Sequence, residues 1–188
     1  MTRGAVAALI QPPKISAVAL IHQEGVLTLV ALVGLAFSQR GILDALGPRQ
    51  GALIAITVGS AAGLGCVAVL WLLRSIPPLK RLEDWQRQVI VGWTTTDAVA
   101  VALVSGFAEE ALLRAFLQPI VGLVPAAVLF AVLHLVPDRS LWIWPVFALA
   151  CGLILGVLYN THGFPAAAAA HIVINLTALL RLRRPESE

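Results

Sequence analysis

The sequence predicts an all-α, polytopic membrane helix bundle with about six transmembrane helices. Apolar residues make up 59% of the 188 residues, whereas charged residues make up 12%, about half the share found in an average soluble domain. The mean hydropathy is +0.90. The apolar residues come in long blocks, and a helix that crosses a bilayer needs about 20 of them. We therefore expect one membrane domain over residues 1–188.

Five blocks after residue 50 are expected to form membrane helices. The clearest spans are residues 51–73, 141–159 and 164–180, which contain no Asp, Glu, Lys or Arg. Residues 120–136 form a shorter block that is also free of charge. A further helix is predicted over residues 89–117, and this helix differs from the others because it carries several charges.

The N-terminal block is ambiguous. Residues 15–38 are long enough to cross a bilayer, but His22, Gln23 and Glu24 interrupt the apolar run. The pattern fits either a full span or an interfacial helix that leads into a short span. Residues 1–90 as a whole contain no motif to which we can assign a function.

The basic residues predict the orientation, since Lys and Arg in short loops accumulate on the cytoplasmic side. With the N-terminus inside, the outer loops hold only Arg40 and Arg49. The inner segments hold ten basic residues: Arg3, Lys14, Arg74, Lys80, Arg81, Arg87, Arg139, Arg181, Arg183 and Arg184. Both termini are therefore expected in the cytoplasm. The net charge of +3 comes from residues that flank spans, without interleaved stacking aromatics, so no nucleic-acid partner is expected.

The stretch "SGFAEEALLRAF", residues 105–116, places Glu109, Glu110 and Arg114 in an apolar helix. An ionisable group near the bilayer centre costs about 2.5 to 3.5 kcal/mol, so such groups usually face the bundle interior and mark a functional site. Glu110 and Arg114 are four residues apart and can form an ion pair on one helix face. Glu109 lies about 100° round the helix and has no local counter-ion. The alternative is a purely structural salt-bridge cluster.

Two other helices carry polar residues with similar spacing. "FAVLH" places Phe130 four residues before His134, and "HIVIN" places His171 four residues before Asn175. Taken alone, an intramembrane histidine more often hydrogen-bonds a neighbouring helix. The depth of each residue can, however, be estimated by counting about 1.5 Å per residue from the predicted turn of its helix. By this count Glu109 lies near the middle of the bilayer, and so do His134, His171 and Asn175. We expect them to converge on one site.

The three motifs together resemble a known family. "EEALLR", "FAVLH" and "HIVIN" match, in order, the EExxxR, FxxxH and HxxxN motifs of the CPBP intramembrane proteases, which include the type II CAAX prenyl endopeptidases and bacteriocin-processing proteins. Each motif is weak alone, but the ordered set on three membrane helices is specific. The resemblance places the protease core at residues 96–180.

The resemblance implies peptide-bond hydrolysis within the membrane. Glu109 would activate water with the help of His134, and His171 and Asn175 would stabilise the oxyanion. Three neighbours would support the site: Glu110, Arg114 and Phe130. We favour this mechanism without a cofactor. The alternative is a metalloprotease in which Glu109, His134 and His171 hold Zn²⁺.

The expected partners are the lipid bilayer and a membrane-associated protein or peptide. The Ala-rich and Arg-rich composition suggests a bacterial inner membrane, where C-terminal anchor tails of exported proteins are one candidate substrate, provided that the site opens outward. The functional alternative is a non-enzymatic carrier, or an immunity or binding protein, since each of these can hold Glu, Arg and His in its interior.

Overall fold

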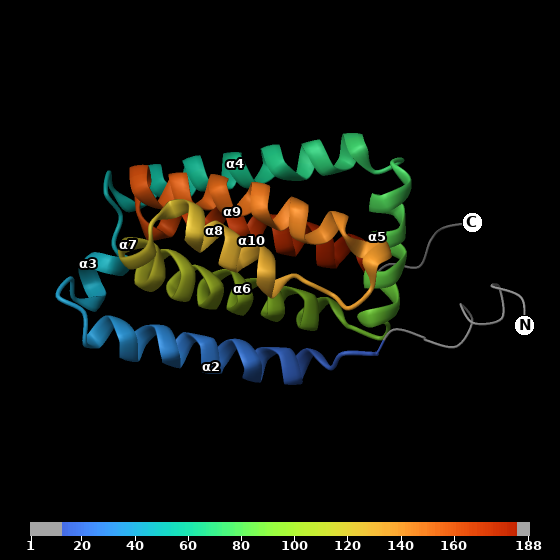
Figure 1. Ribbon diagram of the computed structural model, residues 1–188, viewed down its shortest axis with the longest axis horizontal. Coiled ribbons are helices and arrows are strands. Elements are labelled where there is room, and N and C mark those ends of the chain that lie inside the picture. The colour runs from blue at the N-terminus through green and yellow to red at the C-terminus, as the bar shows by residue number, and fades with distance from the viewer. Residues whose placement is uncertain (1–12, 184–188) are drawn as a thin grey trace, which may run out of the picture.

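A computed structural model describes residues 13–183, and this part of the chain is a bundle of helices without a strand (Figure 1). The helices in chain order are α2 (Ala17–Ala36), α3 (Ile42–Leu46), α4 (Ala52–Leu73), α5 (Pro77–Val89), α6 (Thr95–Glu110), the π-helix η1 (Ala111–Leu117), α7 (Gln118–Val121), α8 (Leu123–Leu133), the 3₁₀ helix η2 (Arg139–Leu141), α9 (Ile143–His162) and α10 (Phe164–Leu182). The helical membrane bundle is thus confirmed.

Four helices between residues 13 and 183 are long and apolar enough to cross a membrane: Ala17–Ala36, Ala52–Leu73, Arg139–His162 and Phe164–Leu182. The other two predicted spans differ from this pattern. The α8 helix has 11 residues, and the α6 helix has 16 residues before it changes into the π-helix η1. The short lengths of these two α-helices therefore explain why four helices, rather than about six, are long enough to cross a membrane.

The α2 helix is continuous, so the polar residues near its start do not break it. Its buried residues are Ala17, Glu24, Ala31 and Leu35, which lie on one stripe because they are separated by seven, seven and four positions. Apolar side chains such as Val26 and Leu29 cover the exposed faces. The stripe turns Glu24 toward the bundle, whereas His22 and Gln23 are exposed.

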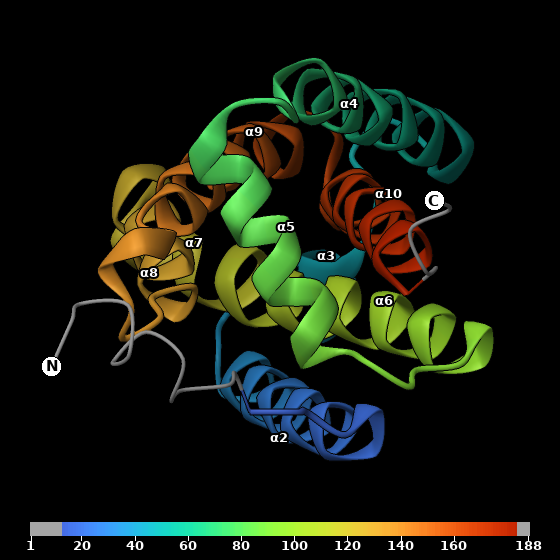
Figure 2. The ribbon, with the colours of Figure 1, turned by 90° about the vertical axis from the view of Figure 1, so that its right-hand side faces the viewer.

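The predicted helix over residues 89–117 begins later than expected, because Val89 ends a separate helix. Gly92 adopts a left-handed φ of 91° in the intervening turn. Thr94 then starts α6 with a capping box, in which its hydroxyl accepts from the amide of Asp97 and the Asp97 carboxylate accepts from the amide of Thr94. The preceding α5 helix was not predicted, since it is short and amphipathic, and it crosses one end of the bundle (Figure 2).

The predicted span over residues 120–136 is also divided. Gly122 has a left-handed φ of 88° and separates α7 from α8. The α8 helix ends at Leu133, shortly before Pro137, which disfavours helical backbone in the residue that precedes it. His134 is therefore the C-terminal cap of α8, and does not lie inside a span as expected.

Close packing brings α6 and α4 against α10. A Cβ atom on Gly63 of α4 would lie 2.6 Å from the carbonyl oxygen of Ala170, and one on Gly106 of α6 would lie 2.5 Å from a side-chain carbon of Ile172. These glycines let the helix backbones approach each other closely. The charged end of α6 thus faces the histidine motif of α10.

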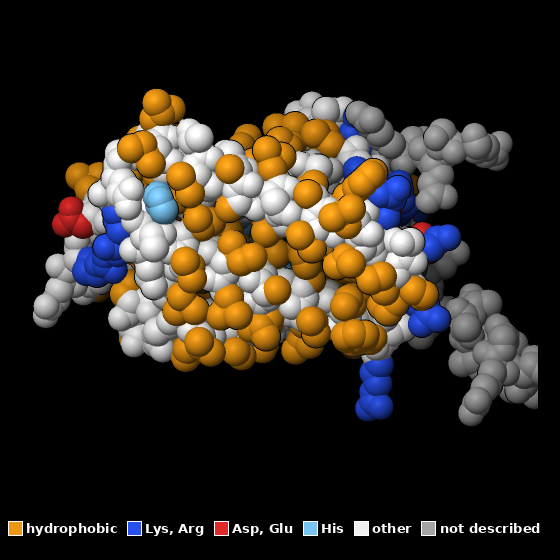
Figure 3. Space-filling view, turned by 90° about the horizontal axis from the view of Figure 1, so that it is seen from above, with side chains coloured by type: hydrophobic (Ala, Val, Ile, Leu, Met, Phe, Trp, Pro, Cys, Tyr) orange, Lys and Arg blue, Asp and Glu red, His pale blue; other side chains and the backbone are white. Residues whose placement is uncertain are grey.

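The surface has an apolar middle and basic ends (Figure 3). Exposed large apolar side chains lie mainly on α2, α4, α8 and α9, where lipid would surround the bundle. The end crossed by α5 carries most of the basic residues within 13–183, including Arg74, Lys80 and Arg87. Arg3, Arg184 and both chain termini lie outside the described residues.

Candidate active site

The first motif lies where α6 changes into the π-helix η1. The Nε atom of Arg114 lies 3.2 Å from Oε2 of Glu110, and both side chains are fully buried. The guanidinium also lies over the ring of Phe130, 5.0 Å from its centroid. The predicted ion pair is therefore present, in a type of helical turn that is frequent at functional sites.

His171 joins the third motif to the first. Its Nδ1 atom lies 2.9 Å from Oε1 of Glu110, and the imidazole is 3% exposed. An ionised carboxylate can only accept a hydrogen bond, so Nδ1 of His171 carries the hydrogen. This contact fixes the orientation of the ring and leaves its Nε2 atom for another partner.

His134 lies beside Phe130, as the motif predicts. Its Nδ1 atom is 2.8 Å from the carbonyl oxygen of Phe130, which can only accept, so Nδ1 donates and Nε2 is the acceptor in the neutral ring. The ring centroid of Phe130 lies 4.6 Å from that of His134 and 5.5 Å from that of His171. Phe130 therefore contacts both imidazoles and the guanidinium of the first motif.

Asn175 is held by a residue that the sequence did not suggest. Its Nδ2 atom donates a hydrogen bond of 2.9 Å to Oγ of Ser105, which is buried on α6. Ser105 lies four residues before Glu109, so the two share a face of α6. The spacing of four residues between Ser105 and Glu109 was the signal in the sequence that could have identified Ser105. The second hydrogen of the Asn175 amide remains free to donate.

Glu109 is half-buried, and its Oε2 atom is buried without a hydrogen-bond partner within residues 13–183. It directly precedes Glu110, which contacts His171. His134, His171 and Asn175 line one cavity of about 230 Å³, whereas Glu109 does not line it. The structure thus brings three of the four predicted catalytic residues to one cavity and places the fourth next to Glu110, the partner of His171.

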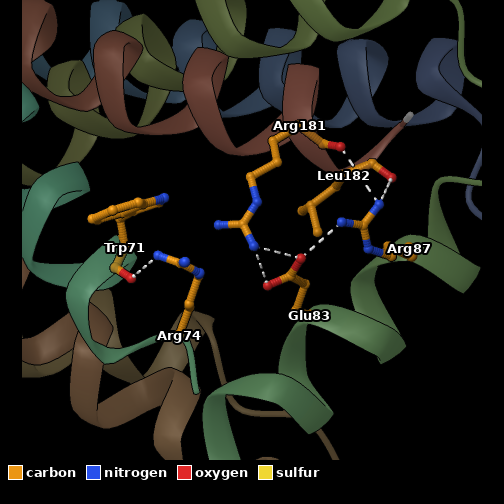
Figure 4. A network of polar contacts seen from close by, with 6 residues as sticks. All are labelled: Trp71, Arg74, Glu83, Arg87, Arg181 and Leu182. Carbon is orange, nitrogen blue, oxygen red and sulfur yellow. Dashed lines mark hydrogen bonds and ion pairs between the residues drawn. The ribbon is translucent and has the colours of Figure 1, made fainter. Parts of the chain in front are cut away.

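The cavity extends from His171 to the end of the bundle that α5 crosses. A polar network surrounds that end (Figure 4). Glu83 of α5 accepts hydrogen bonds from Arg87 at 2.7 Å and from Arg181 of α10 at 2.8 Å. Nearby, Arg74 lies over the ring of Trp71, 4.1 Å from its centroid. Charged side chains therefore border the mouth of a largely apolar cavity.

Comparison with protein families finds a match to the family described as type II CAAX prenyl endopeptidase Rce1-like, over residues 91–177. The match covers 87 of the 188 residues, and over them the chain resembles that family. It supports the prediction of a CPBP protease and indicates an intramembrane endopeptidase of the CAAX type in general. No curated protein and no solved structure matched the chain.

One buried ionisable residue comes from outside the Rce1-like region. Glu24 of α2 is 4% exposed, and α2 packs against α6, the helix that carries Glu109. From the sequence Glu24 was identified only as part of a polar interruption. The Rce1-like region alone therefore does not supply all the buried carboxyl groups of the bundle.

Zinc binding by the Rce1-like region was the alternative expectation. Within residues 13–183, no three His, Cys, Asp or Glu side chains are arranged to hold a metal ion. The Nδ1 atoms of both motif histidines contact Glu110 or the Phe130 carbonyl, which leaves each Nε2 atom free, as in histidines that bind metals. Because the three side chains do not come together as a zinc site in this arrangement, we derive no catalytic step through the metal.

Proposed function

We propose that the protein hydrolyses a peptide bond near the C-terminal tail or within the membrane segment of a membrane-associated protein, with Glu109 activating the water. The contact between His171 and Glu110 carries this proposal, because it joins two motifs and holds them beside Glu109. Residues 96–180 would form the protease core.

In the proposed reaction, the water oxygen attacks the carbonyl carbon of the scissile bond while Glu109 takes a proton from it. The Nε2 atom of His134 can assist as a second acceptor, because its Nδ1 atom donates to the Phe130 carbonyl. When the C–N bond breaks, the proton passes from Glu109 to the leaving nitrogen. This sequence yields a carboxylic acid and an amine, and transfer of the acid's proton then gives a carboxylate and an ammonium group.

Oxyanion stabilisation is assigned to His171 and Asn175. The Nδ1 atom of His171 donates to Glu110, so the ring must be doubly protonated for Nε2 to donate as well. Asn175 can donate its second amide hydrogen, since Ser105 accepts the first. One such donor in a preorganised site is worth about 3 to 4 kcal/mol to the transition state.

Glu110, Arg114 and Phe130 are proposed to hold the site in place. Glu110 contacts both Arg114 and His171. Phe130 packs against the two imidazoles and the guanidinium. These contacts support a positioning role, because each neighbour fixes a group that belongs to another motif.

We propose that both termini are cytoplasmic, in a bacterial inner membrane, and that substrate enters from the α5 end. That end carries most of the basic residues within 13–183, as expected of a cytoplasmic side. The cavity that contains His134 and His171 also extends to it. Cytoplasmic tails are therefore preferred over the anchor tails of exported proteins.

The proposal is tested by mass spectrometry of membrane-protein C-termini in host cells that carry wild type, Glu109→Gln or the control Asp84→Asn at matched expression. Asp84 is an exposed carboxylate on α5, so its substitution should leave the profile unchanged. Specific tails should remain uncut only with Glu109→Gln. Identical profiles for folded wild type and Glu109→Gln would favour a carrier or binding role.

A further inference from the structure

Glu24 is a buried carboxyl group in a membrane-spanning helix that precedes the Rce1-like region. Its Oε2 atom is buried without a hydrogen-bond partner, and the residue forms no ion pair within residues 13–183. An ionisable group in such a place is costly, and it usually has a functional role. The buried stripe of α2 otherwise consists of Ala17, Ala31 and Leu35.

The packing of α2 places Glu24 at the depth of the active site. The α2 and α6 helices lie side by side in both ribbon views (Figures 1 and 2). Gly34 of α2 lies against Phe116 of η1, where an added Cβ atom would be 2.6 Å from the ring. Counting back ten residues on each helix places Glu24 level with Gly106, so Glu24 and Glu109 differ in depth by less than about one turn. Glu109 also has a buried Oε2 atom without a partner in the described chain.

The charges around Glu24 constrain its protonation state. Glu109 and Glu110 are balanced by Arg114 and by His171, once His171 is doubly protonated to serve as an oxyanion donor. An ionised Glu24 would add an uncompensated negative charge to this buried group, which is unfavourable in a low-dielectric interior. A protonated Glu24 leaves the cluster neutral and provides an O–H donor.

We propose that Glu24 is a positioning residue of the active site, which carries a proton and donates a hydrogen bond toward Glu109. This role of Glu24 rests on the proposed function, because Glu24 can position Glu109 for catalysis only if Glu109 activates water. One hydrogen bond would satisfy both unpartnered carboxyl oxygens. It would also hold Glu109 beside His171 while leaving its second oxygen available to water.

The experiment compares Glu24→Gln, Glu24→Ala and the control Gln23→Ala in the full-length protein, purified and reconstituted in lipid, with a substrate peptide identified from the uncut tails. Glutamine retains the shape and a donor without the charge, so kcat should stay within about threefold of wild type. Alanine removes the donor to a charged group and should lower kcat by at least about tenfold. KM should not change, since Glu24 acts through Glu109. Gln23 is exposed on the same helix, and its substitution should have no effect.

Infrared spectroscopy tests the protonation state without using activity. Wild type should show the carbonyl band of a protonated carboxyl group, and Glu24→Gln should lack it. Glu24→Met replaces the alanine variant if the smaller side chain lowers the yield of folded protein, because methionine fills similar space without a donor.

Several outcomes would overturn the proposal. Equal losses in Glu24→Gln and Glu24→Ala would show that a charged carboxylate is required, and wild-type kcat in both Glu24→Ala and Glu24→Met would show that Glu24 has no role. A missing infrared band would exclude the proton. Glu109→Gln is measured in parallel: if it remains active, the proposed function fails, whereas an inactive Glu109→Gln beside a fully active Glu24→Ala refutes only the role of Glu24.

Discussion

The Nδ1 atom of His171 donates to Oε1 of Glu110 across 2.9 Å, in a contact where both side chains are almost fully buried. The other carboxylate oxygen of Glu110 faces Arg114 at 3.2 Å. Both oxygens of Glu110 are therefore engaged. This arrangement distinguishes two adjacent glutamates that are identical in chemistry, because Glu110 is paired with Arg114 and His171 whereas Glu109 forms no ion pair within residues 13–183.

Removing Arg114 should destabilise the protein strongly. Arg114→Met leaves Glu110 as a buried charge without its cation, which typically costs about 3 to 5 kcal/mol. Adding Glu110→Gln should recover part of this loss because it removes that charge. Thermal unfolding in detergent measures both effects. A single Arg114→Met variant as stable as wild type would contradict the assigned ion pair.

Removing Asn175 should affect catalysis more than removing the residue that orients it. Asn175→Ala loses one oxyanion donor and should lower kcat by about 10² to 10³. Ser105→Ala leaves the amide in place but loses its 2.9 Å hydrogen bond, so a smaller decrease is expected. Steady-state kinetics gives the comparison, with Ser60→Ala in α4 as the control. The assignment fails if Ser105→Ala reduces kcat while Asn175→Ala does not.

Two glycines of α4 should respond oppositely to the same substitution. A Cβ atom on Gly63 would lie 2.6 Å from the Ala170 carbonyl oxygen, whereas one on Gly65 would have no atom within 4 Å. Gly63→Ala should therefore reduce stability by about 1 to 3 kcal/mol. Gly65→Ala should be neutral or gain up to about 1 kcal/mol from helix propensity. Equal melting temperatures for the two variants would argue against the close packing of α4 on α10.

Metal removal should not change the rate of cleavage. The proposed mechanism uses Glu109 and His134 to activate water, so dialysis against a chelator should leave kcat/KM unaltered. Activity is measured before and after dialysis, with the metal content determined in both samples. A loss of activity that added Zn²⁺ restores would instead support the zinc alternative.

Much of the fold was predictable because long apolar helices carry a strong signal. The predicted spans 51–73 and 164–180 agree with Ala52–Leu73 and Phe164–Leu182 within two residues at each end. The predicted helix boundaries that were wrong lie where local backbone features begin or end a helix. The turn at Gly92 and the capping box at Thr94 delay α6, and Gly122 divides the span that follows.

The site was predictable where helical spacing determines contacts, and less so where two helices meet. The pairing of Glu110 with Arg114 follows from their spacing of four residues. The contact between Glu110 and His171, and that between Ser105 and Asn175, depend on how α6 packs against α10. The position of Glu24 depends on which face of α2 is buried, and a helix that is apolar on most sides does not reveal that face.

Cleavage in water enriched in ¹⁸O tests most directly whether Glu109 activates water for peptide hydrolysis. Purified wild type and Glu109→Gln are reconstituted in lipid with a substrate peptide, and the products are analysed by mass spectrometry. We predict that wild type yields a new C-terminal carboxylate carrying one solvent oxygen, and that folded Glu109→Gln yields none above background. Labelled product formed by Glu109→Gln at the wild-type rate would contradict the account.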